Sequence, residues 1–200
     1  DNNTAVGRSA LLNNTTGAQN TAVGQAAGDA LTVGSYNVAL GQNALSSDTQ
    51  GSQSVAIGSS ALFTQNFTSA TAANNTAVGH GAGAAVTTGI YNTFIGGICG
   101  DSAQTVSYST LVGANMSTGD TSSNNCNGLG YGINAVSGYT TVGIGINDIR
   151  AAHGTATWAA VSDQRYKKDI VDSTAGLSFI NALQPRTFKY KTLGELPETF

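Results

Sequence analysis

The chain has 200 residues, of which 26 are Gly and 2 are Pro, and 10% are charged while 40% are hydrophobic. Disorder needs low hydrophobicity with high charge, and collagen needs Gly at every third position with abundant Pro, so both classes are excluded. The net charge of −3 gives no electrostatic reason to expect nucleic acid, and no run of about 18 apolar residues could cross a bilayer as a helix.

The charged residues divide the chain into two parts. Residues 1–150 hold 8 of them, whereas the last 50 residues hold 11, together with every Lys, every Glu, both Pro and the only Trp. This change marks a boundary in composition, and the two parts are expected to differ in structure.

A five-residue unit recurs through the first part of the chain. It reads Asn or Ser, Thr or Val, usually Ala, then Val, Leu or Ile, and finally Gly. Successive closing glycines are 17 residues apart, except for one interval of 21 and one of 13. These glycines stand at positions 7, 24, 41, 58, 79, 96, 113, 130 and 143. The regular period predicts a repeat architecture.

Each unit has the alternation of a short β-strand. The Thr or Val and the residue before Gly share one face, and the Asn or Ser and the Ala share the other. Gly then turns the chain, a small residue follows three positions later, and a second turn signal comes at Gly17, Gly34, Gly51 and Gly89. The 17 residues therefore predict one coil of a solenoid, and eight coils at roughly 4.8 Å each would extend about 40 Å.

The two faces of these strands cannot both be buried inside so thin a coil. We expect stacking to bury the Val/Ile face and the Ala/Asn face to receive further copies of the chain, which gives a homotrimer; a monomer with a solvated Ala/Asn face is the alternative. The four extra residues before Gly79 predict a loop that bulges out at Phe63–Phe67.

The cysteines, histidines, tyrosines and aspartates of this part are predicted mainly to have structural roles. Cys99 and Cys126 lack metal-ligand spacing and are predicted to fill small slots. His80 and His153 are expected at the surface or in packing, and no metal or cofactor is expected. Five tyrosines could form a partial exposed ladder suited to sugar stacking, although strand packing is the alternative: Tyr36, Tyr91, Tyr108, Tyr131 and Tyr139. Four aspartates that follow the motif glycines are predicted to be solvated turn residues: Asp29, Asp48, Asp101 and Asp120.

The repeat units resemble the Asn-x-Val-Ala-Ile-Gly repeats of trimeric autotransporter adhesin heads and of phage tail-fibre shafts. Ser54–Gly58 carries the likeness most clearly, and it extends over residues 1–145. The resemblance implies a trimeric β-roll or β-prism shaft, so the expected fold is an all-β repeat solenoid followed by a small α+β segment.

The last part of the chain has a different pattern. Apolar residues at 177, 180 and 183 have helical spacing and Pro185 ends the segment, while Thr187–Tyr190 is predicted to be a short strand. Ser162 and Lys167 stand five residues apart, and a desolvated lysine can act as the base that a serine nucleophile needs. A Ser-Asp helix cap followed by a basic turn is the alternative.

The run Ser-Asp-x-Arg-x-Lys-x-x-Ile from Ser162, followed by Gly-Leu and Leu-x-Pro, resembles the C-terminal intramolecular chaperone of endosialidase-type tail spikes and fibres. That resemblance implies trimerisation followed by self-cleavage of the Val161–Ser162 bond, with Ser162 as nucleophile and Lys167 as general base. Asp163 and Arg165 would support the loop by pairing. The family's chaperone is longer than residues 162–200, so we expect these residues to be its start.

The sequence thus predicts a shaft at 1–145, a connector at 146–161 and a chaperone segment at 162–200. The expected function is that of a virion tail-fibre or tail-spike protein for host attachment, with other tail proteins and a host glycan or outer-membrane receptor as partners. No enzyme that acts on an external substrate is expected, and no membrane insertion. A bacterial trimeric surface adhesin, which would be extracellular, and an ice-binding solenoid are the alternatives.

Overall fold

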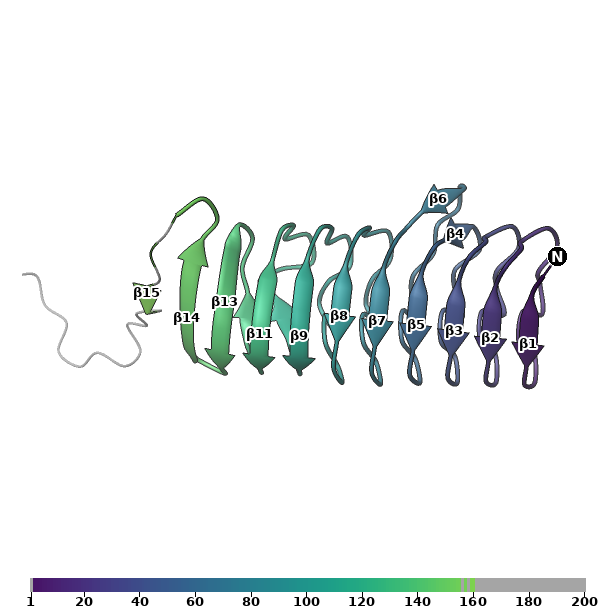
Figure 1. Ribbon diagram of the computed structural model, residues 1–200, viewed down its shortest axis with the longest axis horizontal. Coiled ribbons are helices and arrows are strands. Elements are labelled where there is room, and N and C mark those ends of the chain that lie inside the picture. The colour runs from purple at the N-terminus through teal and green to yellow at the C-terminus, as the bar shows by residue number, and fades with distance from the viewer. Residues whose placement is uncertain (1, 156, 158, 161–200) are drawn as a thin grey trace, which may run out of the picture. The chain divides into compact units, whose positions relative to one another are not determined.

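The computed structural model describes residues 2–155, 157, 159 and 160, which belong to one compact unit, Asp1–Val161. This unit is a stack of coils, each of which adds one strand to an 11-stranded sheet (Figure 1). No described residue is helical. The strands of this sheet, in spatial order, are β1 (Thr4–Val6), β2 (Thr21–Val23), β3 (Val38–Leu40), β5 (Val55–Ile57), β7 (Thr76–Val78), β8 (Thr93–Ile95), β9 (Thr110–Ala114), β11 (Asn127–Tyr131), β13 (Tyr139–Ile144), β14 (Asn147–Ala152) and β15 (Ala159–Ala160).

The strands pair in parallel and in register with the sequence repeat. Between β2 and β3, for example, Ala22 lies opposite Ala39 and Val23 opposite Leu40. This pairing continues from β1 to β13, and the predicted solenoid of 17-residue coils is confirmed. At the end of the stack, β13 and β14 are antiparallel, as are β14 and β15. Two short parallel pairs lie elsewhere on the coils: β4 (Gly51–Ser52) with β6 (Thr71–Ala72), and β10 (Ser117–Thr118) with β12 (Asn134–Ala135).

The glycine that closes each motif is required by both conformation and space. From Gly7 to Gly130 these residues have φ between 126° and 147°, a region that side chains rarely adopt. A Cβ on Gly41 would also lie 2.6 Å from the carbonyl carbon of Gly58 in the next coil. The column of glycines therefore lets successive coils approach at strand spacing, which explains why the residue recurs in every copy.

The two strand faces lie opposite to the prediction. The Ala position is buried in Ala22, Ala39, Ala56 and Ala77, whereas the residue before Gly is partly or largely exposed in every copy. The expectation that stacking would bury the Val/Ile face was wrong. The interior of the coil takes the amide side chains and the Ala position, which is filled by Phe94 in β8 and by Leu111 in β9, while the residue before Gly points outward.

A ladder of buried Asn side chains explains why the amide face points inward. Asn37 Nδ2 donates to the carbonyl of Gly51 across its own coil (3.0 Å), and its Oδ1 accepts from the backbone N–H of Ser54 in the next coil (2.9 Å). Asn20, Asn75 and Asn92 repeat both bonds. Each Asn therefore satisfies two buried backbone groups that the turns would otherwise leave without partners.

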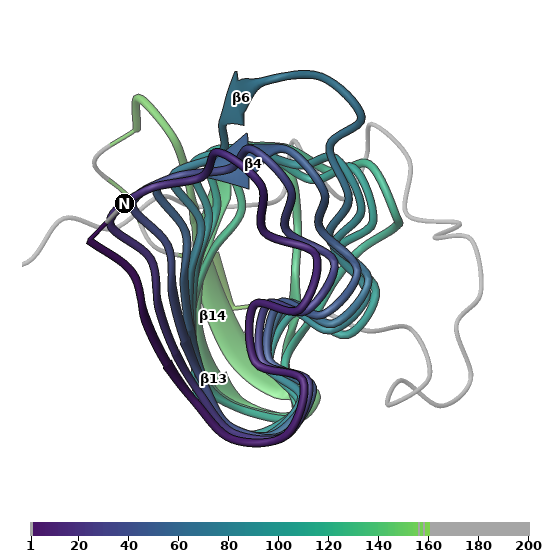
Figure 2. The same ribbon diagram turned by 90° about the vertical axis from the view of Figure 1, so that its right-hand side faces the viewer.

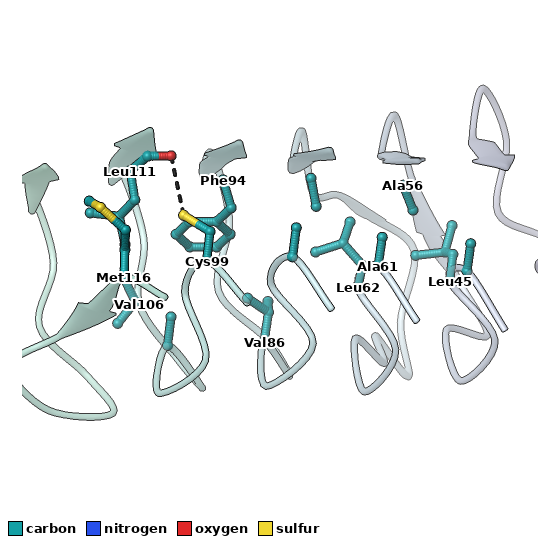
Figure 3. Packing of buried hydrophobic residues seen from close by; sticks show 14 of the residues in the cluster. Leu45, Ala56, Ala61, Leu62, Val86, Phe94, Cys99, Val106, Leu111 and Met116 are labelled. Atoms are coloured by element: carbon teal, nitrogen blue, oxygen red, sulfur yellow. Dashed lines mark hydrogen bonds between the residues drawn. The ribbon is translucent and has the colours of Figure 1, made fainter. Parts of the chain in front are cut away.

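The core is filled by matching large and small residues between coils. Phe94 takes the place of Ala in the motif and is fully buried, and a Cβ built on Gly83 or on Gly100 would lie 2.9 Å from its ring. The small residue expected three positions after Gly is buried from Ala27 to Cys99, beside the larger side chains of the cluster (Figure 3). A large side chain in one coil thus lies against a glycine or small residue of a neighbouring coil, which keeps the interior closely packed.

The four extra residues of the long coil form a bulge that lies later in the chain than predicted. Gln65 and Phe67 are buried, and Gln65 Nε2 donates to Asp48 Oδ2 (2.6 Å) at the normal 17-residue offset. The offset is still 17 where the Gln50 N–H donates to the Phe67 carbonyl, and it is 20 where β4 pairs with β6, so most of the extra residues lie at Thr68–Ala70. The segment from Thr68 to β6 projects beyond the other coils when they are viewed along the stack (Figure 2). Apolar Phe67 and paired Gln65 stay inside because their exposure would be unfavourable, whereas Thr, Ser and Ala tolerate water.

Candidate functional site

The outer face of the sheet carries a continuous apolar column. Nine residues that precede the motif glycines align from strand to strand, and several are largely exposed, such as Val6 (56%), Ile95 (40%) and Leu129 (53%). The column consists of Val6, Val23, Leu40, Ile57, Val78, Ile95, Val112, Leu129 and Val142. A long row of exposed apolar side chains is unusual for a monomer and is typical of an interaction surface.

Beside the apolar column runs a row of Thr and Val side chains on the same outer face. Thr21 pairs with Val38, Val38 with Val55, and Val55 with Thr76. The Thr residues at the second position of the motif therefore align from strand to strand, but Val38 and Val55 interrupt their row. We refer to the apolar column and this row together as the outer sheet face.

A second surface feature lies at the corner two residues before each strand. Here eight non-glycine residues adopt left-handed φ between 51° and 63°, and we call them the corner column: Asn2, Gln19, Tyr36, Gln53, Asn74, Tyr91, Tyr108 and Asn125. The rings of Tyr91 and Tyr108 stack with centroids 5.4 Å apart and planes 9° from parallel. Of the five tyrosines of the expected ladder, Tyr36, Tyr91 and Tyr108 share this column, while Tyr131 and Tyr139 lie at strand positions.

Asp48 contradicts the expectation that it is a solvated turn residue, because it is fully buried. Its Oδ1 accepts from the N–H groups of Gly51 (2.9 Å) and Phe67 (3.1 Å), and its Oδ2 accepts from Gln65. Gln65 Oε1 accepts in turn from Asn75 Nδ2 (2.8 Å). In the coil of Ser54, where the motif has no Asn, these bonds take the place of the bonds of the Asn ladder. The role of Asp48 is therefore structural.

The other aspartates differ in burial. Asp101 and Asp120 are exposed, and hydrogen bonds from Ser122 and Ser123 lower the pKa of Asp120, that from the Ser122 backbone N–H most strongly. Asp29 is half-buried, and desolvation raises its pKa.

The two cysteines are unsuited to nucleophilic chemistry. Both thiols are buried, and desolvation raises the pKa of Cys99 to about 12 and also raises that of Cys126. Cys99 Sγ donates to the carbonyl oxygen of Leu111 (3.4 Å; Figure 3). Because the thiolate is the reactive form, these residues fill space in the core, as their sequence context indicated.

Both histidines lie at the surface of the compact unit. His80 is exposed, and His153 Nε2 lies 3.2 Å from Asn127 Nδ2 and 3.3 Å from Thr140 Oγ1 at the end of the stack. Within residues 2–155, 157, 159 and 160, no group of three His, Cys, Asp or Glu could hold a metal ion. The same residues include no helix long and apolar enough to cross a membrane.

The last described strands lie within the segment 146–161 that precedes the predicted cleavage site. In β14, Asp148 is buried and forms an ion pair with Arg150 (3.1 Å), whose guanidinium also donates to the carbonyl of Asn134 (3.2 Å). β13 is the last strand of the parallel run and pairs antiparallel with β14, and the compact unit ends at Val161.

The predicted catalytic and supporting residues lie outside the described residues. These are Val161, Ser162, Asp163, Arg165 and Lys167, and the predicted helix at 175–183 and strand at 187–190 lie outside them as well. The dyad therefore rests on its sequence pattern.

Comparison with known proteins supports the chaperone part of this pattern. Residues 162–199 match the family model described as chaperone of endosialidase. The comparisons with curated proteins and with solved structures gave no match. The family match thus begins at the residue that follows the compact unit of coils.

Proposed function

We propose that this chain is a virion structural protein, a tail fibre or tail spike for host attachment, whose C-terminal module drives trimerisation and is then removed by autoproteolysis before Ser162. A β-solenoid followed by an endosialidase-type chaperone segment fits a protein of this class. The observation that carries the proposal is the coincidence of two boundaries, because the compact unit ends at Val161 and the family match begins at Ser162.

The proposed cleavage is a single turnover within the chain. The hydroxyl of Ser162 adds to the carbonyl carbon of Val161 while the neutral amine of Lys167 takes its proton. The C–N bond then breaks, the proton passes to the leaving amine, and the resulting ester is hydrolysed by water. The products are a shaft that ends in the carboxylate of Val161 and a module that begins with the amine of Ser162, with Asp163 and Arg165 holding the loop.

The outer sheet face is the surface that we assign to trimer contacts. The sequence placed these contacts on the Ala/Asn face, but that face is buried within each coil, so it is not available to another copy. The outer face offers the aligned apolar column from Val6 to Val142, and burial of such a column against other copies would stabilise an assembly in proportion to its apolar area.

Assembly of such a shaft explains why it would need a chaperone. Parallel pairing between distant segments is slow, and near-identical 17-residue repeats invite slips in register, by whole coils or between chains. A trimerising module aligns the three chains before the coils stack. Its removal afterwards makes the assembled state hard to reverse, so that the trimer is kinetically trapped.

Expression of the full chain tests the proposal directly. We expect a native mass of three shafts, and on denaturing gels a shaft fragment of residues 1–161 with a second fragment of residues 162–200. Ser162→Ala and Lys167→Ala should each leave a single uncut band, whereas the neighbouring variants Ser178→Ala and Lys168→Ala should cleave normally. Mass spectrometry locates the cut. The dyad assignment is wrong if both dyad variants still cleave between Val161 and Ser162.

Two alternatives make different predictions. A bacterial surface adhesin would share the coils and the trimer but should not cleave at Ser162. An ice-binding solenoid is favoured by the Thr row on the outer sheet face, although Val38 and Val55 interrupt it and the chaperone segment has no role in such a protein. Thermal-hysteresis activity of the purified chain would support the ice-binding alternative.

A further inference from the structure

The corner column combines an unfavourable backbone conformation with large exposed side chains. Left-handed φ is disfavoured for residues with a Cβ, and glycine is the usual solution. Another left-handed corner of the coils uses Gly28, Gly83 and Gly100, or places buried Leu45 and Leu62 there, whose packing compensates for the strain. The corner column contains no glycine, and its tyrosines are 49–57% exposed. Left-handed φ alone does not set this column apart, because Ile98 and Asn115 adopt it at exposed positions of a third corner. The corner column differs in that it gathers three exposed tyrosines among amide side chains, and such aromatic residues are typical of contact surfaces.

The side chains of this column present free hydrogen-bonding groups on a rigid support. The backbone N–H of Tyr36 donates to Ala18 (3.0 Å) and that of Tyr91 to Ala73 (2.8 Å), so each residue is held by the preceding coil. No described residue accepts a hydrogen bond from the hydroxyls of Tyr36, Tyr91 or Tyr108, and the side-chain amides of Gln19, Gln53 and Asn125 have no partner among the described residues. A ligand would therefore meet preorganised groups that need not break internal bonds.

Aromatic residues are interspersed with amide residues along the stack. Tyr36 lies between Gln19 and Gln53, and the stacked pair Tyr91 and Tyr108 lies between Asn74 and Asn125. Successive members of the column are one coil apart, roughly 4.8 Å, so the groups repeat along a line. A linear polymer that runs along the stack would meet a phenol or an amide at each coil.

The residues next to the column in sequence are uncharged from residue 18 onward. From residue 18 to residue 126, neither the column residues nor their immediate neighbours in sequence include Asp, Glu, Lys or Arg. The chain as a whole carries a net charge of −3, which opposes the approach of a polyanion. The chemistry of the column therefore favours a neutral ligand.

We infer that the corner column binds a neutral linear glycan that runs along the axis of the coils. Because Tyr91 and Tyr108 stack on each other, a ligand along the axis would meet their ring edges and hydroxyls. The hydroxyl groups of a sugar can bond to these phenols and to the side-chain amides, while its apolar C–H groups contact the exposed rings. This inference deepens the host-attachment part of the proposed function and rests on it for the source of the glycan. It makes the shaft itself a receptor-binding surface.

The test uses the full chain with three neutral polysaccharides, mannan, dextran and galactan, and with hyaluronan as a polyanionic comparator. Affinity electrophoresis measures binding, and native mass measures assembly. The double variant Tyr91→Asn/Tyr108→Asn removes both stacked rings, yet keeps a residue that the column already uses at Asn74 and Asn125. Tyr131→Asn is the matched control, because Tyr131 is 57% exposed and lies outside the column.

We expect at least one neutral polysaccharide to bind, the double variant to weaken that binding by about tenfold or more, and Tyr131→Asn to leave it unchanged. The inference is overturned if none of the three binds, if hyaluronan binds best, or if the control weakens binding equally. Loss of the native mass in the double variant would instead identify the column as a contact between copies. Normal cleavage at Ser162 without glycan binding refutes this inference alone, and glycan binding without cleavage refutes the proposed dyad alone.

Discussion

Phe94 and Ile95 are neighbours in β8, yet the structure treats them in opposite ways. Phe94 is fully buried and its ring requires glycine at Gly83 and Gly100, whereas Ile95 is 40% exposed on the outer sheet face. The inner side of each strand must match a narrow space coil by coil. The outer side needs only to pack with the same position of the strands beside it. Two adjacent apolar residues in one strand thus serve two different surfaces, the core of the coil and the face that we assign to other copies.

Within this pair, the larger effect should come from the inner residue. Phe94→Ala would leave a cavity between two glycines that cannot fill it, which should lower the free energy of unfolding by about 3–5 kcal/mol. Denaturant unfolding followed by circular dichroism measures this change. Ile95→Ala is the control on the same strand: it should leave the coils folded but make the proposed trimer dissociate more readily on dilution. Equal loss of β structure in both variants would contradict the assignment of the two faces.

An effect of similar size is expected when the polar part of the inner side is removed. Asn37→Ala would leave the carbonyl of Gly51 and the N–H of Ser54 buried without partners, at about 1–3 kcal/mol for each group. The unfolding midpoint in urea should therefore fall. Asn37→Ser should cost less, because Ser109 occupies the same column and its Oγ accepts from the N–H of Cys126 (2.9 Å). If the two substitutions lower the unfolding midpoint equally, the hydrogen bonds of the Asn ladder do not account for the stability of the coil.

The smallest effect is a dependence on alkaline pH. Burial raises the pKa of Cys99 from 9.0 to about 12, so the folded state holds a proton that the unfolded state releases. Its contribution to stability is present below pH 9 and is lost as the pH rises from 9 to about 12. Cys99→Ala should fold, since Ala27, Ala44 and Ala61 occupy equivalent positions, and should show a weaker loss of stability in that range. An identical pH profile for the two proteins would exclude Cys99 as its source.

Much of this architecture could be predicted from the repeat. The strand positions, the turn glycines and the small buried residues from Ala27 to Cys99 all follow from a 17-residue period, because stacked coils place equivalent residues above one another. The match of residues 162–199 to the endosialidase chaperone was likewise indicated by the run that begins at Ser162. These features are local in sequence, or they repeat with the period.

The features that could not be predicted depend on what lies across the coil. Asp48 gives no local sign of burial, since its partners Gln65 and Phe67 belong to the next coil. The bulge at Thr68–Ala72 was misplaced for the same reason, because Gln65 is held inside by Asp48. The corner column was visible only in part, since the amides that flank its tyrosines share their position through the backbone conformation of the coil.

The sequence by itself determined the period, the glycine at each close approach and the boundary before Ser162, because each of these follows from residue type and spacing. Only the tertiary structure decided which face of each strand points inward. Alternation shows that two faces differ, but both the Val/Ile face and the Ala/Asn face are compatible with a strand. The choice follows from the width of the coil and from the backbone groups at its turns, which the inward Asn side chains satisfy.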